Sequence, residues 1–288
     1  MWREGGDPTG ERPIVPRMLT VTRWPELREP ILVMALTGWV DAGLAGSGAL
    51  AALREQFARA DDFATLELGD LMDLQQTRPT ARFVDGERVI EWPAITFSAG
   101  RLGRDVVLVH GPEPSLRWSA VAESIVTAAR TLGVRRAYAL AGMPALVSHR
   151  RAVPVLATAT HRSLAQELAP LRATYAGPTG LQTIVQRALG DADIPCAGFW
   201  AQVPQYVSGS PSPAAVRAVL RRLAEVARLE LDLRPLDARV EAYVARVDAG
   251  LSTRPDVREV VERIDHEQVA STDDLVSEIE LFLRQQDD

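Results

Sequence analysis

The sequence predicts an α/β protein whose core is a three-layer α/β/α sandwich around a mostly parallel or mixed sheet. Short apolar runs alternate with helical patterns throughout residues 19–208, which is typical of strands connected by helices. The run at residues 105–110 is almost continuously apolar, as expected of a parallel strand buried on both faces. Beyond residue 209 only helical patterns remain.

Each element of the core follows from this alternation. Apolar runs rich in Val, Ile and Leu predict strands at residues 19–22, 31–37, 63–68, 105–110, 135–141, 154–159 and 195–203. Apolar residues at helical spacing predict helices at residues 42–59, 119–132, 161–168 and 178–189. Gly133 and Gly190 stand where two of these helices are expected to end.

The strand at residues 31–37 leads into the turn Gly38-Trp39-Val40-Asp41-Ala42-Gly43 and then into a helical pattern. In open α/β sheets ligands bind at such a corner between strand and helix. The glycines do not follow the order of a dinucleotide-binding or P-loop motif, so close packing of the helix on the sheet is an alternative to anion binding. Asp41 stands where the helix begins, which suits an N-cap as well as a polar group of a site.

Residues 80–98 predict an inserted β-hairpin. Asp85-Gly86 lies between two β-rich segments, and glycine supplies the positive φ that a primed turn requires. With no helix to cover it, the hairpin is expected to protrude and to form an oligomer interface through its apolar residues Phe83, Val84, Val89, Ile90 and Trp92.

The predicted domain organisation has three parts. Residues 1–18 form a flexible N-terminal tail, residues 19–208 the α/β/α core and residues 209–288 a C-terminal helical cap. Ser212-Pro213 suits the start of the first cap helix, at residues 213–229. Further helices are expected at residues 235–248 and 255–268 and after the capping box at 271–274. A cap over the strand ends would shape or gate a pocket.

Composition excludes several functions. The net charge is −6, and the interleaved charges provide no basic field for nucleic acid or for an anionic membrane. All basic residues are arginine, which excludes a phosphate-binding P-loop lysine and Schiff-base chemistry. The single cysteine, Cys196, fits a reducing cytoplasm, and the polar N-terminus has no signal-peptide pattern. We therefore expect a cytoplasmic protein.

No motif names a reaction. The weak catalytic candidates are Asp41, His110 and His149, and for each histidine the alternative is an ordinary polar loop residue. The histidines lack the spacing of a metal site, no G-x-S-x-G motif occurs, and we expect neither a metal nor a cofactor. The residues expected to line a crevice at the strand ends are Gly38, Trp39, Asp41, Gly43, Gly111, Glu113, Met143, His149, Arg150, Gln205 and Tyr206.

Three motifs resemble the PAC2 family, which contains proteasome assembly chaperone 2 proteins and their archaeal and actinobacterial relatives. They are Gly38-Trp39-Val40-Asp41-Ala42-Gly43, Gly142-Met143-Pro144 with residues 147–151, and residues 198–206. The resemblance covers residues 19–285 and implies a nucleoside-phosphorylase-like core without an established reaction. For an actinobacterial-type member it further implies an oligomerising hairpin and a C-terminal helical lid.

The chain departs from the family pattern at three places. Val40 and Gln205 replace the asparagine and the histidine that the family usually has in its first and third motifs, and Ser148-His149-Arg150-Arg151-Ala152 replaces Pro-His-Thr-Arg-Pro. Family members that dock on proteasome rings resemble one another in a C-terminal hydrophobic-Tyr-any tail. This chain ends Arg284-Gln285-Gln286-Asp287-Asp288, so we do not expect proteasome docking by that route.

Two functions remain open from the sequence. The first is a non-enzymatic binding or assembly protein that forms a homo-oligomer, such as a trimer, through its hairpin and has a protein partner. The second is a hydrolase or a phosphorylase-like enzyme that acts on a small molecule in the lidded crevice. A ligand sensor is a third possibility.

Overall fold

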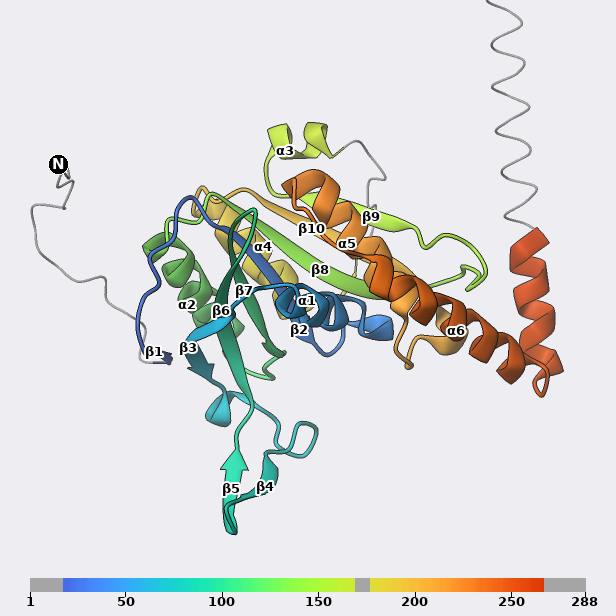
Figure 1. The fold of residues 1–288 in the computed structure, drawn as a ribbon, viewed down its shortest axis with the longest axis horizontal. Helices are drawn as coiled ribbons and strands as arrows, with labels where there is room; N and C mark the ends of the chain where they lie inside the picture. The colour runs from blue at the N-terminus through green and yellow to red at the C-terminus, as the bar shows by residue number, and fades with distance from the viewer. Residues whose placement is uncertain (1–17, 169–176, 267–288) are drawn as a thin grey trace, which may run out of the picture.

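The computed structural model describes residues 18–168 and 177–266 as a central sheet between two layers of helices (Figure 1). Eight strands form the sheet in the order β1-β3-β6-β7-β2-β8-β10-β9. Their bounds are β1 Leu19–Val21, β2 Ile31–Thr37, β3 Asp61–Glu67, β6 Ala94–Leu102, β7 Arg104–Pro112, β8 Arg136–Ala145, β9 Val155–Ala159 and β10 Cys196–Pro204. The predicted α/β/α class is confirmed.

Five strands of this mixed sheet run in one direction. β7, β2, β8 and β10 are joined by parallel pairs. β3 has the same direction because two successive antiparallel pairs, with β6 as the shared strand, connect it to β7. The carboxyl ends of β3, β7, β2, β8 and β10 therefore meet on one side of the sheet, which we call the carboxyl end of the sheet.

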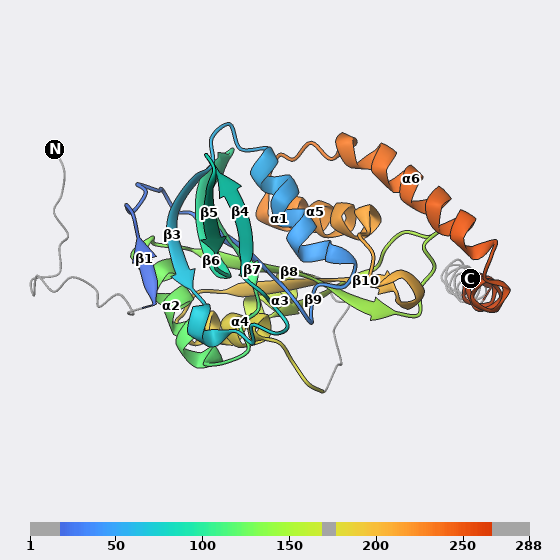
Figure 2. The same cartoon turned by 90° about the horizontal axis from the view of Figure 1, so that it is seen from below.

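Helices cover both faces of the sheet (Figure 2). α1 (Ala45–Glu55) and α5 (Pro213–Ala227) pack against each other on one face, and α2 (Trp118–Thr131) and α4 (Leu181–Asp191) do so on the other. The short helix α3 (Arg162–Glu167) contacts β9. Two hydrophobic cores result, one beneath each pair of helices.

The central strand β2 contributes to both cores because its side chains alternate between the two faces. Leu32, Met34 and Leu36 belong to the core beneath α2 and α4. Ile31 and Val33 belong to the core beneath α1 and α5, and each of these side chains is at most 1% exposed. This accounts for the uninterrupted apolar run in the sequence.

The C-terminal helices occupy two positions. Ser212 caps α5 by accepting a hydrogen bond from the N–H of Ala215 at 3.3 Å, as the Ser-Pro pattern predicts. α5 lies in the same layer as α1. α6 (Arg234–Leu251) and a further helix over residues 255–266 contact the loop after β8. The helix expected after the capping box at 271–274 lies outside the described residues.

The predicted hairpin is present as β4 (Thr80–Val84) and β5 (Glu87–Glu91), a separate two-stranded sheet. Asp85 and Gly86 have φ values of 51° and 86°, as a type I′ turn requires. The hairpin stands away from the rest of the molecule (Figure 1), and every residue of its two strands is exposed.

Several boundaries differ from those expected. β6 was not predicted, because its small and polar residues hide the apolar alternation, and it begins within the range expected for the hairpin. The helix expected at residues 42–59 begins as the 3-10 turn η1 (Ala42–Leu44), and α1 itself ends at Glu55. Leu44, with φ 49°, separates the two. Gly190 lies inside α4 instead of ending it.

Candidate functional site

The loops at the carboxyl end of the sheet carry the residues that the sequence predicts for a crevice. A first group belongs to β7 or to the turns after β2 and β7, namely Gly38, Trp39, Asp41, Gly43, Gly111 and Glu113. A second group lies in β8, after β8, or in the turn η3 (Gln205–Val207) after β10, namely Met143, His149, Arg150, Gln205 and Tyr206. The two groups have different environments.

Asp41 is bound to the first turn of α1. One carboxylate oxygen accepts the N–H groups of Gly46 at 2.8 Å and Ser47 at 3.2 Å, and the other accepts the Ser47 hydroxyl at 2.5 Å. Burial raises the pKa of Asp41, and these hydrogen bonds offset part of that rise. Each oxygen already has a protein donor, so the Asp41 side chain satisfies N–H groups in the first turn of α1, while Leu44 occupies the N-cap position of that helix.

Gln182 fills the space where β2 and β8 separate, and Glu113 lies after β7 on the other side of β2. The two strands pair over only the first four residues of β2. Beyond them the buried Gln182 side chain accepts the N–H of Leu36 and donates to the carbonyl of Leu140, both at 3.0 Å. Glu113 accepts the N–H of Leu181 at the start of α4. Protein side chains thus fill the gap in which this type of fold often binds a ligand.

Gly43 connects the first group to the segment after η3. Its N–H donates to the carbonyl of Ser208 at 2.7 Å, and its carbonyl accepts the N–H of Ser212 at 2.8 Å. A Cβ here would lie 3.0 Å from side-chain atoms of Ser212 and Val203, and φ is +65°. Close packing between two protein segments therefore explains this glycine.

His110 faces a polar cluster of Arg54, Asp62 and Ser98. The Ser98 hydroxyl donates to Asp62 at 2.6 Å and accepts from Arg54, while His110 Nε2 lies 3.4 Å from that hydroxyl. Burial lowers the pKa of His110, and the charge of Arg54 lowers it further. Because the Ser98 proton points to Asp62, His110 is not positioned to remove it. The cluster is therefore not a serine-hydrolase relay.

His149 forms a buried relay with Tyr206 and Asp248. The Tyr206 hydroxyl accepts the backbone N–H of His149 at 3.0 Å and lies 2.8 Å from its Nδ1, and Nε2 lies 3.2 Å from Asp248. With its oxygen accepting the amide, the hydroxyl donates its proton to Nδ1, and the Nε2–H then donates to Asp248. Burial lowers the pKa of His149 although Asp248 opposes this. The relay suits a neutral imidazole.

Arg150 fastens the loop after β8 to the C-terminal helices. Its guanidinium donates to Asp248 at 2.7 Å and to Asp265 at 3.2 Å, and Arg151 lies 3.8 Å from Asp265. Burial alone would raise the pKa of Asp248, but hydrogen bonds from Arg150 and His149 hold it below the usual value. This arginine pairs with the protein's own carboxylates.

The three catalytic candidates lie in separate environments. Asp41 contacts α1, His110 contacts the cluster around Ser98, and His149 contacts Tyr206 and Asp248, with no shared hydrogen-bond partner in the described part of the chain. Residues 18–168 and 177–266 contain no group of three or more His, Cys, Asp or Glu that could hold a metal ion. No helix within these ranges is long and apolar enough to cross a membrane.

Exposed large apolar side chains gather at the carboxyl end of the sheet. In the described residues they are Trp39, Leu44, Leu74, Phe83, Val84, Val89, Ile90, Trp92, Leu116 and Leu146. Each lies in a segment that follows β2, β3, β7 or β8. The segment between β3 and β6, which contains the hairpin, leaves and rejoins the sheet at this same end. We call these ten residues the apolar end surface.

Comparisons with known proteins identify the family. A family model described as the PAC2 family matches residues 35–250. The chain belongs to the PAC2 family. No match was found among curated proteins.

Three solved structures place the chain within PAC2-like folds. A PAC2 family protein from Streptomyces avermitilis is 36% identical, with 81% of this chain and 99% of that chain covered and a TM-score of 0.75. The proteasome-assembly chaperone homologue Rv2125 of Mycobacterium tuberculosis is 34% identical, with coverage of 80% and 99% and a TM-score of 0.73. PbaB, an archaeal proteasome activator from Pyrococcus furiosus, shares the fold at 20% identity, with coverage of 80% and 97% and a TM-score of 0.66.

The PAC2 motifs meet at the carboxyl end of the sheet. Asp41 of the first motif forms a parallel bridge with Gly142 of the second, and Gly142 is paired with Ala201 of the third. Val40, where the family usually has asparagine, is buried, whereas Trp39 beside it is 61% exposed. The first PAC2 motif therefore presents an aromatic side chain at its surface.

The sequence did not single out the partners that define these environments. Gln182 is an ordinary residue of a helical pattern, and Asp248 and Asp265 lie on helices about 100 residues after His149 and Arg150 in the chain. The buried Ser98 lies in the strand that was not predicted. A carboxylate at a helical position carries no signal of its distant partner.

Proposed function

We propose that this PAC2 family protein is a non-enzymatic assembly-type protein that binds other polypeptides through the apolar end surface. The observation that carries the proposal is the gathering of all ten exposed large apolar side chains of the described residues at one end of the sheet. Several large apolar side chains exposed at one end of a folded protein are typical of interaction sites.

The hairpin is proposed as the self-association element. Cross-strand pairing places Phe83 and Ile90 on one face, with Arg88 lying over the Phe83 ring at 5.4 Å, and Val84 and Val89 on the other. Both faces expose large apolar side chains beside charged ones, and an isolated two-stranded hairpin is only marginally stable in water. Pairing with a second copy of the chain would bury these side chains.

The remaining part of the apolar end surface is proposed as the partner site. It is formed by Trp39, Leu44, Leu116 and Leu146 in the turns after β2, β7 and β8, together with Leu74 before β4 and Trp92 after β5. The names of two structural relatives, a proteasome-assembly chaperone homologue and an archaeal proteasome activator, support a proteasome-related protein as the partner. The buried single cysteine suits the cytoplasm as the place of action.

The enzyme alternative has less support from the geometry. Asp41 and Glu113, which would be the polar groups of the crevice at β2 and β7, bind the protein's own backbone N–H groups. Gln182 occupies the gap between β2 and β8. A substrate would have to displace these interactions in order to use the same groups.

The proposed self-association is tested by the mass in solution of a hairpin variant. We expect the wild type to be oligomeric and Phe83→Ser/Ile90→Ser to be of lower mass in light scattering, because both changes remove apolar area from one face. Glu87→Ser, on the same hairpin and equally exposed, is the matched control and should retain the wild-type mass. An unchanged mass of the double variant would contradict the role of the hairpin.

The partner site is tested separately with Trp39→Ser/Leu146→Ser. We expect this variant to keep its oligomeric mass but to lose binding to recombinant proteasome α-subunits in native mass spectrometry. If the wild type binds no α-subunit, the proteasome-related partner is wrong. If the variant binds as well as the wild type, the surface after β2 and β8 is not the partner site.

A further inference from the structure

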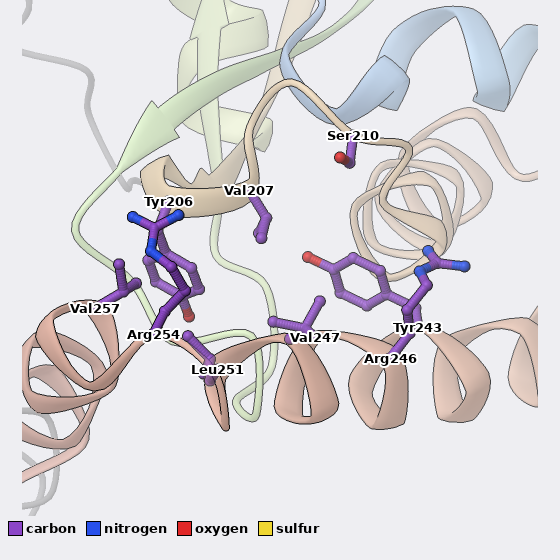
Figure 3. Close-up of a pocket in the computed structure, with 10 residues that line it drawn as sticks. Tyr206, Val207, Ser210, Tyr243, Arg246, Val247, Leu251, Arg254 and Val257 are labelled. Atoms are coloured by element: carbon purple, nitrogen blue, oxygen red, sulfur yellow. The ribbon is translucent and has the colours of Figure 1, made fainter.

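A cavity lies between η3 and α6 (Figure 3), and none of the apolar end surface residues lines it. It is a cavity of about 320 Å³, near the lower limit for small-molecule sites. Its walls are mostly apolar or aromatic and come from η3, α6 and the helix that follows. The apolar and aromatic part of the wall includes Tyr206, Val207, Tyr243, Val247 and Leu251.

The Tyr243 hydroxyl is an unusual feature of this cavity. Tyr243 is 1% exposed, and its hydroxyl has no hydrogen-bond partner among the described residues. Burial raises the pKa of Tyr243, and the nearby Ser212 offsets part of that rise. The two hydroxyl groups do not have the geometry of a hydrogen bond. In Figure 3 the hydroxyl points toward the interior, near Val207. A buried hydroxyl without a partner is costly, and Tyr243 contributes its ring, not an accessible hydroxyl, to the cavity wall.

Two arginines at opposite ends of the cavity supply positive charge. Arg246 lies over the Tyr243 ring at 5.9 Å and forms no ion pair with any described residue. Arg254, on the side of Tyr206, forms an exposed ion pair with Asp256 at 3.6 Å (Figure 3). Exposed pairs of this kind contribute little. Both guanidiniums therefore have donors available for an anion.

We propose that the cavity binds an elongated small molecule with an acidic group at each end and an apolar middle, such as a medium-chain dicarboxylate. Arg246 and Arg254 hold the two acidic groups, and Val207, Val247 and Leu251 contact the apolar middle. This proposal does not depend on self-association or on a protein partner.

The test is titration of the full chain with octanedioate, octanoate and 1,8-octanediol in a calorimeter. We expect octanedioate to bind with a dissociation constant below about 1 mM, at least about tenfold more tightly than octanoate, since each ion-pairing end is assigned about 1.4 kcal/mol. The diol should not bind measurably. Equal binding of the diol would show a merely apolar groove, and no binding of octanedioate would overturn the proposal.

Variants locate the site. Arg246→Gln and Arg254→Gln should each weaken octanedioate binding about tenfold, whereas Arg239→Gln, an exposed arginine of the same helix outside the cavity, should not. Because Tyr206 lines the cavity and bonds to His149, octanedioate should shift the NMR signals of the His149 ring and leave those of His110 unchanged. An equal effect of Arg239→Gln, or shifts at His110 alone, would contradict the assignment.

Discussion

Removing the Tyr206 hydroxyl should destabilise the fold strongly for a single oxygen atom. Tyr206→Phe leaves two groups of His149 without a partner, its backbone N–H and its Nδ1, and the His149 side chain is fully buried. Each buried group left unsatisfied costs about 1–3 kcal/mol. For two such groups we expect a loss of roughly 2–6 kcal/mol in the free energy of unfolding.

Urea unfolding of the two single variants measures this loss. Tyr243→Phe is the matched control, because it removes the same atom from the wall of the same cavity but breaks no hydrogen bond. It should leave the free energy of unfolding unchanged or raise it slightly. A substitution at an ordinary surface position changes the free energy of unfolding by less than about 0.5 kcal/mol. A loss for Tyr206→Phe below that value, or equal losses for both variants, would refute the hydrogen bonds between Tyr206 and His149.

Three further predictions follow from buried groups. Burial lowers the pKa of both His149 and His110, so the unfolded chain binds more protons than the folded chain below about pH 6.5. The free energy of unfolding should therefore fall as the pH is lowered from about 7 to 5, by at most about 1.4 kcal/mol per pH unit for each histidine. A free energy of unfolding that does not change over this range would contradict the prediction. Gly46→Ala should abolish or severely weaken folding in circular dichroism, because its Cβ would lie 2.3 Å from the Leu140 carbonyl, whereas Gly209→Ala meets no atom within 4 Å and should be tolerated. Burial raises the pKa of the Cys196 thiol, so iodoacetamide should label it only in denaturant, and rapid labelling of the native protein would be inconsistent with the core position.

The sequence predicts best those elements whose burial is symmetrical. β2 and β7 are covered by helices on both faces, and their uninterrupted apolar runs reveal them directly. β6 escapes prediction because it includes Thr96, Ser98 and Gly100, which a strand tolerates when its neighbours supply the packing. At Gly100, for example, the Phe57 ring occupies the space that a Cβ atom would need. Such compensation between distant residues leaves no local pattern.

The environments of the candidate residues were harder to predict for the same reason. The sequence identifies Asp41 as a possible cap, because the acceptor and its donors are local. It places His149 and Tyr206 in one region but not in one hydrogen-bonded pair, and it gives no indication that Asp248 completes the relay. Contacts between elements far apart in the chain depend on how α6 packs, which no short motif encodes.

The turn after β2 connects a parallel strand to a helix, as the ligand-binding turns of nucleotide-binding folds do, and its side chains change what it can bind. In such folds the N–H groups at a helix N-terminus bind an anion. Here Asp41 occupies N–H groups of α1, and Glu113 occupies one of α4. A phosphate at either helix would meet a carboxylate that already holds the donors. The same turn exposes Trp39, close in the chain to Leu44, and both are apolar. A turn that satisfies its own polar groups and exposes an aromatic ring is better suited to a protein surface than to a small anion.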